Sequence, residues 1–262
     1  MGASFIWTFH NLAPHECKHP RLANWCARQL VQLVDGAIFL SSTSQKKACS
    51  SYPRLNQVES IVIQHGDYRP MLYPTEGKRS TRQKLGIPEK AKTLGFIGRI
   101  RPYKQLALLV NAFRATDDPS IRLLIAGEPD GSSEVAQCLA EAAKDPRVVF
   151  SIGLLPEKTL QEAVEACDLL VFPNLSVSNS GSIIYALSNN RPVLVAQCED
   201  MKELARQSSP DSVLFFDGKV SEADLLAALH HVTESKGEKT LTLPEWKKIA
   251  CMHIDFYEKV CR

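Results

Sequence analysis

The chain has 262 residues and a net charge of +2, and 44% of its residues are hydrophobic and 23% are charged. These proportions are typical of a soluble globular protein with one large domain or two of ordinary size. The small net charge argues against a general nucleic-acid binder, which normally carries a larger basic surplus. No apolar run is long enough to cross a bilayer, and no signal peptide is visible.

The eight cysteines are scattered and include no CxxC pair. This usage is typical of a reducing compartment and favours a cytoplasmic protein. The basic cluster of Lys78, Arg79, Arg82 and Lys84 is predicted to be solvated surface. Peripheral membrane contact through a basic surface stays open, because these residues alone do not establish it.

Short apolar runs alternate along the chain with longer amphipathic stretches. Strands are expected at 5–9, 36–40, 60–64, 93–97, 122–126, 148–151, 168–172, 192–196 and 212–216. Helices are expected at 21–33, 44–50, 105–115, 133–144, 157–166, 182–188, 202–206, 222–233 and 244–260. This alternation predicts an α/β fold of parallel sheets with helices on both faces.

Prolines and charged residues gather at 74–89, which we predict to be the hinge between two domains. We expect a first α/β domain at 1–75, a fuller one at 76–245, and a closing helix at 246–262. The first domain offers only three strands, and so small a parallel sheet leaves an open edge. Either the chain is a fragment of a longer protein, which we favour, or a partner covers that edge.

The loop from Gly98 to Lys104 directly follows the predicted strand 93–97. Gly98 permits close approach of the backbone to a ligand at the end of the strand. Arg99 offers a planar fork that suits phosphate oxygens, and Lys104 adds a point charge. The alternative is a basic loop with Lys104 in the first turn of a helix, where a cation opposes the helix dipole. We therefore favour an anion site.

A second polar loop, Asn179-Ser180-Gly181-Ser182, follows the apolar strand 168–172 and leads into a helix. Ser178 or Asn179 would cap this helix, and Gly181 would let the backbone turn under a ligand. Helix N-termini favour anions, although most capped helices bind nothing. Together the two loops predict a diphosphate held at the carboxyl ends of parallel strands.

Other strand exits carry glycine, at Gly127 and Gly153, and there a ligand contact and a simple turn are equally plausible. His10 ends the first strand, either as a structural residue or as a donor to a substrate hydroxyl. The spacing of the other histidines matches no metal site, so we exclude metal. The motifs GxGxxG, GxxxxGK[ST] and GxSxG are absent, which excludes the corresponding dehydrogenase, P-loop and serine-hydrolase readings.

These pieces resemble retaining, nucleotide-sugar-dependent glycosyltransferases of the GT-B type, which have two Rossmann-like domains, close to glycosyltransferase family 4 (glycosyl transferases group 1). The similarity extends through nearly all of the chain and is strongest from Leu94 to Val195. It rests on the order and spacing of five pieces: 96–100 with Lys104, 124–127, 149–150 with Gly153, 168–173 and 191–194. The resemblance implies an α/β GT-B fold whose first Rossmann-like domain is incomplete, and a last helix that crosses back to it.

By this resemblance, Arg99 and Lys104 would hold the donor's diphosphate beside Gly98, with help from the loop of residues 179–182. His10 would contact the transferred sugar, and Gly153 and Leu154 would lie near the base. No cofactor and no metal would be needed, because cations and helix dipoles stabilise the leaving diphosphate. The implied reaction moves a sugar from a UDP- or GDP-sugar to a glycan or lipid-linked acceptor in polysaccharide or glycoconjugate synthesis.

The chain also departs from this family. Counting back from Pro192, the two glutamates that the family carries eight positions apart fall at Val177 and Tyr185, and neither side chain is a carboxylate. The second glutamate commonly binds the ribose hydroxyls. This loss, with the incomplete first domain, motivates a second hypothesis: a non-catalytic binding or scaffold protein, or an inactive fragment. A third is a two-domain sugar-nucleotide epimerase.

Overall fold

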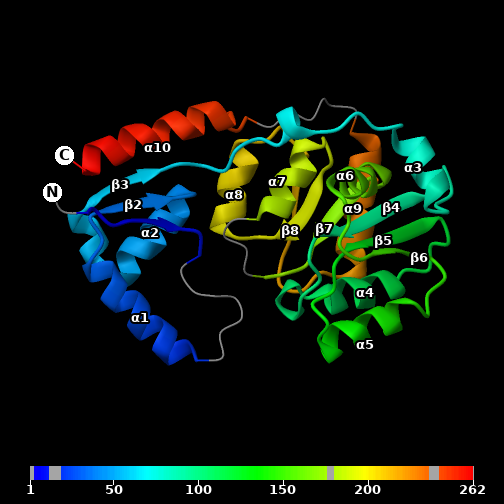
Figure 1. Ribbon diagram of the computed structural model, residues 1–262. Helices are drawn as coiled ribbons and strands as arrows, with labels where there is room; N and C mark the ends of the chain where they lie inside the picture. The colour runs from blue at the N-terminus through cyan, green and yellow to red at the C-terminus, as the bar shows by residue number, and fades with distance from the viewer. Residues whose placement is uncertain (1–2, 12–18, 176–179, 236–241, 262) are drawn as a thin grey trace. The chain divides into compact units, whose positions relative to one another are not determined.

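The computed structural model describes residues 3–11, 19–175, 180–235 and 242–261, and the chain divides into two compact units (Figure 1). Unit 1 comprises Met1–Asp67 and Thr242–Arg262, and unit 2 comprises Tyr68–Leu241. Residues 68–75, which we expected in the first domain, thus lie in unit 2. Hydrogen bonds hold them there: the Tyr73 N–H donates to Gln161 Oε1 at 2.8 Å, and Gln161 Nε2 donates to the Tyr73 carbonyl at 2.9 Å.

Unit 1 is built on a parallel sheet with the strand order β1-β2-β3 among its described residues. Its elements are β1 (Ile6–Phe9), α1 (Pro20–Gln32), β2 (Gly36–Phe39), α2 (Ser42–Ser51), η1 (Pro53–Gln57), β3 (Glu59–Val62) and α10 (Trp246–Val260). Successive side chains of a strand point to opposite faces. Phe39 therefore packs in one core with residues of α1 and α2, while Ile38 packs with Ile249 and Phe256 of α10 on the other face.

Unit 2 is built on a second parallel sheet, with the order β6-β5-β4-β7-β8-β9 in the part of the chain that is described. Its strands are β4 (Lys92–Ile97), β5 (Ile121–Gly127), β6 (Val148–Ile152), β7 (Leu169–Phe172), β8 (Val193–Ala196) and β9 (Val213–Phe216). Every predicted strand of the chain is present, and its bounds differ from expectation by at most two residues. In chain order the sheet reads 3-2-1-4-5-6, which is the Rossmann arrangement. The predicted α/β class is therefore confirmed.

Helices cover both faces of this sheet (Figure 1). They are α3 (Lys78–Lys84), α4 (Leu106–Arg114), α5 (Ser133–Ala142), α6 (Glu157–Ala166), α7 (Gly181–Ser188), α8 (Glu199–Arg206) and α9 (Glu222–Glu234), with the short turns η2 (Arg69–Met71) and η3 (Pro102–Lys104). On one face, Phe113 of α4 and Leu225 of α9 join Phe96 of β4 in a fully buried core. On the other, α3 packs against α6.

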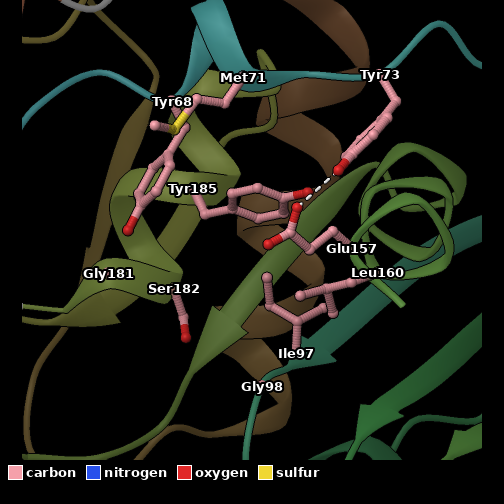
Figure 2. A pocket seen from close by; sticks show the side chains of 10 residues that line it. All are labelled: Tyr68, Met71, Tyr73, Ile97, Gly98, Glu157, Leu160, Gly181, Ser182 and Tyr185. Carbon is pink, nitrogen blue, oxygen red and sulfur yellow. Dashed lines mark hydrogen bonds between the residues drawn. The ribbon is translucent and has the colours of Figure 1, made fainter. Parts of the chain in front are cut away.

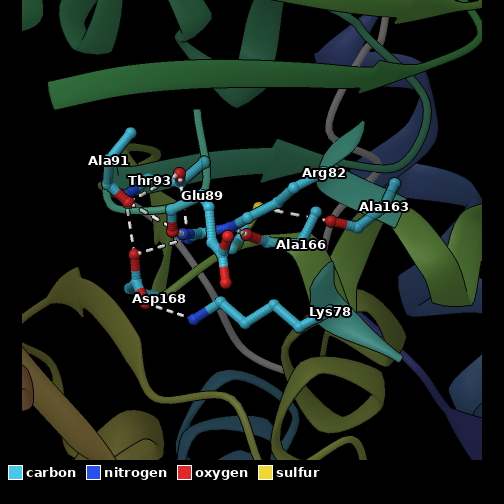
Figure 3. A network of polar contacts seen from close by, with 9 residues as sticks. Lys78, Arg82, Glu89, Ala91, Thr93, Ala163, Ala166 and Asp168 are labelled. Carbon is cyan, nitrogen blue, oxygen red and sulfur yellow. Dashed lines mark hydrogen bonds and ion pairs between the residues drawn. The ribbon is translucent and has the colours of Figure 1, made fainter. Parts of the chain in front are cut away.

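The predicted hinge at 74–89 contains helix α3, and the prediction of a solvated basic surface is wrong for Arg82 (Figure 3). Arg82 is only 4% exposed. Its guanidinium donates to the carbonyls of Ala166, Glu89 and Ala91 at 2.8–2.9 Å and to Asp168 at 2.8 Å. The helix was missed because seven residues without an apolar stripe give no periodic signal.

Asp168 is the anion that offsets the free-energy cost of burying the Arg82 guanidinium. Its carboxylate also accepts the Thr93 N–H at 2.7 Å and pairs with Lys78. Burial raises the pKa of Asp168, but the Lys78 ammonium, the Thr93 N–H and Arg82 together hold it below its usual value. The same burial lowers the pKa of Lys78. The cluster therefore ties α3 to the amino ends of β4 and β7.

We predict that Asp168→Asn lowers the free energy of unfolding by about 3 kcal/mol, because it leaves the Arg82 charge buried without its anion. Urea unfolding of both proteins measures the difference. The control is Glu141→Gln, which removes an exposed carboxylate paired with Lys144 at 2.5 Å and should cost less than about 1 kcal/mol. Equal losses in the two variants would contradict the role assigned to Asp168.

Candidate functional site

The strand order of unit 2 reverses between β4 and β7. These two strands are neighbours in the sheet. The strand that follows β4 in the chain, β5, lies on one side of the pair, and the strand that follows β7, β8, lies on the other side. In open parallel sheets, the crevice for ligands forms at such a reversal, beyond the carboxyl ends of the strands. The chain leaves β4 at Gly98, and the chain leaving β7 leads to the start of α7 at Gly181. The two predicted loops therefore share one edge of the sheet.

Gly98 lies where these loops meet. Its φ angle is +98°, which favours glycine, and a Cβ there would lie 2.9 Å from Ser182 Oγ and 3.1 Å from Lys104 Nζ. Gly127 supports this exit from the neighbouring strand, since a Cβ on it would lie 2.1 Å from the Gly98 carbonyl oxygen. Three predicted site residues, Gly98, Lys104 and Ser182, are thus brought together by two loops that are far apart in sequence.

Lys104 is a partly buried cation at this point. Its Nζ lies 6.0 Å from the centroid of the Phe96 ring, a weak cation–π contact. Burial, with a smaller effect of Arg101, lowers the pKa of Lys104 to about 8. Within the described ranges, neither an ion pair nor a hydrogen bond is found for its ammonium. A desolvated ammonium of this kind is a ready partner for an anion.

Helix α7 places its N-terminus at the same point. Its N-cap is Ser180, whose side chain accepts the Ile183 N–H at 3.4 Å. We expected Ser178 or Asn179 as the cap, and the structure has Ser180 instead; Ser178 and Asn179 lie outside the described ranges. The first N–H groups of a helix have no intrahelical acceptor and carry the positive end of its dipole. Gly181 and Ser182 therefore add to the field of Lys104.

A cavity of about 270 Å³ opens beside Gly98 and Ser182 (Figure 2). It is lined by Tyr68, Met71, Tyr73, Ile97, Gly98, Glu157, Leu160, Gly181, Ser182 and Tyr185. The rings of Tyr68 and Tyr185 meet edge to face, with centroids 5.5 Å apart. Burial, followed by the charge of Glu157, raises the pKa of Tyr185 to about 12, so its hydroxyl keeps its proton at neutral pH. The cavity thus combines aromatic walls with hydroxyl donors.

Other predicted residues do not line this cavity. The Arg99 side chain is 63% exposed, and its Nε lies 3.3 Å from Glu128 Oε2. Gly153, with φ +132°, and Leu154, which is 83% exposed, follow β6 at the edge of the sheet. His10 is exposed and follows β1 in unit 1. The roles assigned to these residues, and to Asn179 outside the described ranges, stay predictions.

Sequence reasoning missed most of the cavity wall. Tyr185 was noted only as the place of a missing glutamate, and Glu157 only as the first residue of the predicted helix 157–166. Tyr68 and Tyr73 carried no signal, because they belong to a connecting segment whose contacts are set by tertiary structure. Among the described residues, no cluster of three or more potential metal ligands is found, and no helix is long and apolar enough to cross a membrane.

Known proteins are similar to this chain in sequence and in fold. Two proteins from Xanthomonas campestris pv. campestris, both named GDP-mannose:glycolipid 4-beta-D-mannosyltransferase, are 28% and 29% identical over 98% of this chain and 68% of their own length. Sucrose-phosphate synthase from Thermosynechococcus elongatus superposes with a TM-score of 0.75 at 18% identity, over 97% of this chain and 67% of the other. Anabaena HepE in complex with UDP-glucose superposes with a TM-score of 0.72 at 16% identity, over 98% of this chain and 71% of the other.

These structural matches show the fold, and it is the GT-B fold that the sequence resemblance implied. The profile that describes glycosyl transferases group 1 matches residues 77–241, more than half of the chain and nearly all of unit 2. The matched region includes both loops at Gly98 and the helix α7. The chain therefore belongs to the glycosyl transferases group 1 family and is a transferase of sugars.

Proposed function

We propose that the chain transfers a hexose from a nucleoside diphosphate sugar, with UDP or GDP as the leaving group, to a glycan or lipid-linked acceptor. The observation that carries this proposal is the meeting of Lys104, Gly98 and the α7 N-terminus at the strand reversal. Relatives named GDP-mannose:glycolipid mannosyltransferases support it, and so does a solved neighbour in complex with UDP-glucose.

The chemistry of this proposal is stabilisation of a leaving diphosphate. When the bond from the sugar's anomeric carbon to oxygen breaks, negative charge grows on the diphosphate. A fixed ammonium and the N–H groups of a helix stabilise that charge without reorganisation, and most strongly where water is excluded. Arg99, held at the surface by Glu128, would add a second cation on reaching the phosphates. His10 would contact the transferred sugar.

A lipid-linked acceptor is supported by helix α1 of unit 1. Leu22, Trp25 and the C-cap residue Leu33 are 58%, 59% and 65% exposed, and at 3.6 residues per turn their positions fall on one side of the helix. Exposed arginines of α1 flank them. Apolar side chains beside basic ones suit the surface of an anionic membrane. We propose this face for peripheral membrane contact.

Two candidate reactions differ in stereochemistry: the sugar is transferred with retention or with inversion of its anomeric configuration. The resemblance to retaining enzymes implies that the anomeric configuration is kept. The relatives from Xanthomonas are named beta-mannosyltransferases, and a β-linkage made from an α-linked GDP-sugar requires inversion. We propose inversion, because that similarity covers 98% of the chain.

We predict that the product of an α-linked GDP-sugar carries a β-linkage. Inversion uses a base to deprotonate the acceptor hydroxyl as it attacks from the face opposite the leaving group. The one-bond carbon–hydrogen coupling at the anomeric carbon, measured by NMR on the isolated product, reports the configuration. An α-linked product would establish retention instead. Donor binding without any product would favour the scaffold hypothesis.

We also predict that Lys104→Ala weakens binding of the donor by about 30-fold or more, as expected when a charged hydrogen bond to phosphate is lost. Titration calorimetry with UDP- and GDP-sugars measures the dissociation constant. Lys90→Ala, at an exposed lysine of the same unit, is the control and should leave it unchanged. Adding Arg99→Ala should abolish binding. Wild-type affinity in that double variant would refute the diphosphate site.

Donor affinity should also fall as pH rises. Only the protonated Lys104 attracts the diphosphate, and its pKa in the free protein is lowered to about 8 by burial. Affinity should therefore be constant below about pH 7 and fall about ten-fold per pH unit above pH 8, until the higher pKa of the bound state is reached. Calorimetry between pH 6.5 and 9.5 measures this, and a flat profile would contradict it.

A further inference from the structure

The cavity of unit 2 is electrically polarised. Gly98 and Ser182 line it next to the Lys104 ammonium. Glu157, the first residue of α6, is the one carboxylate among the ten lining residues. Tyr185 also lines the cavity, four residues of α7 beyond Gly181 and so about 6 Å further along the helix. A ligand with an anion beside Lys104 and N–H donors beside Glu157 would match both groups.

Glu157 is held in place by its neighbours (Figure 2). Its Oε2 accepts the hydroxyl of Tyr73 at 2.8 Å. Tyr73 is in turn fixed to α6 through its backbone, by the two hydrogen bonds with Gln161. A carboxylate has about four acceptor positions, so the bond from Tyr73 leaves it able to accept further donors. Figure 2 shows the carboxylate beside the phenol groups of Tyr73 and Tyr185, which line the same cavity.

We propose that Glu157 selects guanine as the base of the donor, by accepting the N1–H and the exocyclic amino group of the guanine edge. This inference rests on the proposed function, in which Lys104, Gly98 and the α7 N-terminus receive the diphosphate, and it adds that the cavity beside them receives the nucleoside. Aromatic side chains such as Tyr68 and Tyr185 would provide contacts for the flat base.

The selectivity follows from the pattern of donors on each base. Guanine presents two adjacent N–H donors, which match the two oxygens of a carboxylate. Uracil presents a single N–H between two carbonyl oxygens, and these repel a carboxylate. Adenine presents an acceptor beside its amino group. The ribose diol is also a pair of donors, but it is common to all nucleotides and gives no preference among bases.

The test is titration calorimetry of the full chain with GDP, IDP, UDP and 2′-deoxy-GDP, for the wild type and Glu157→Gln. We expect the wild type to bind GDP about ten-fold or more tightly than UDP, and IDP, which lacks the amino group, more weakly than GDP. Glu157→Gln should weaken GDP binding about ten-fold or more and change UDP binding by no more than about two-fold. Removal of the 2′-hydroxyl should leave the effect of the variant intact.

Two further variants separate recognition from structure. Tyr73→Phe removes the hydrogen bond to Glu157 but keeps the carboxylate, so its preference for GDP over UDP should persist. Glu162→Gln makes the same change elsewhere on α6, outside the cavity, and should leave all affinities unchanged.

Equal weakening of GDP and UDP in Glu157→Gln would overturn the inference and assign Glu157 to the ribose. Equal affinity of the wild type for GDP and UDP, with binding still dependent on Lys104, would overturn the inference alone. A wild-type chain that binds neither nucleotide would overturn the proposed function, and the inference with it.

Discussion

The candidate site of unit 2 depends on one constraint, the reversal of strand order between β4 and β7. Parallel strands release their chains at the same edge, and at a reversal the two exits cannot be covered by the same crossover helix. Gly98 and the start of α7 therefore meet without either loop being long. The φ of +98° at Gly98 disfavours any residue with a side chain, and a Cβ there would displace Ser182 Oγ, which explains why a glycine follows β4.

At the amino edge of the same sheet, ionic groups stabilise the packing of α3 against the strands. There the Asp168 carboxylate, just before β7, links the backbone of β4 to Lys78 and Arg82 of α3. The carboxyl edge instead holds Lys104, whose ammonium has no carboxylate partner in the described part of the chain. Ionic groups are compensated where they serve stability. At the proposed diphosphate site, Lys104 is a buried cation without a carboxylate partner among the described residues, and burial lowers its pKa.

The family pattern has a glutamate at position 185, where this chain has a tyrosine, and the structure places a different carboxylate in the same cavity. A tyrosine there cannot supply a carboxylate, but α6 brings Glu157 to the same cavity, where burial and then the charge of Glu157 raise the pKa of Tyr185. The cavity thus contains a carboxylate from α6, where the family pattern expects one on α7, and neutral hydroxyl donors from α7 and from the segment that contains Tyr68 and Tyr73. This rearrangement is compatible with a nucleotide donor whose base is read from α6.

The sequence by itself determined the order of the strands and of the described α-helices other than α3, the α/β class and the family. Apolar runs such as 168–172 and glycines at strand ends are local signals, and the positions of Gly98, Lys104 and Ser182 followed from them. It did not reveal α3, whose stability comes from the contacts of Arg82 rather than from its own pattern. Nor did it reveal the cavity wall, since Tyr73, Glu157 and Tyr185 are far apart in the chain. Only tertiary structure decided these, because burial and pairing depend on which elements pack together, and no local period encodes that.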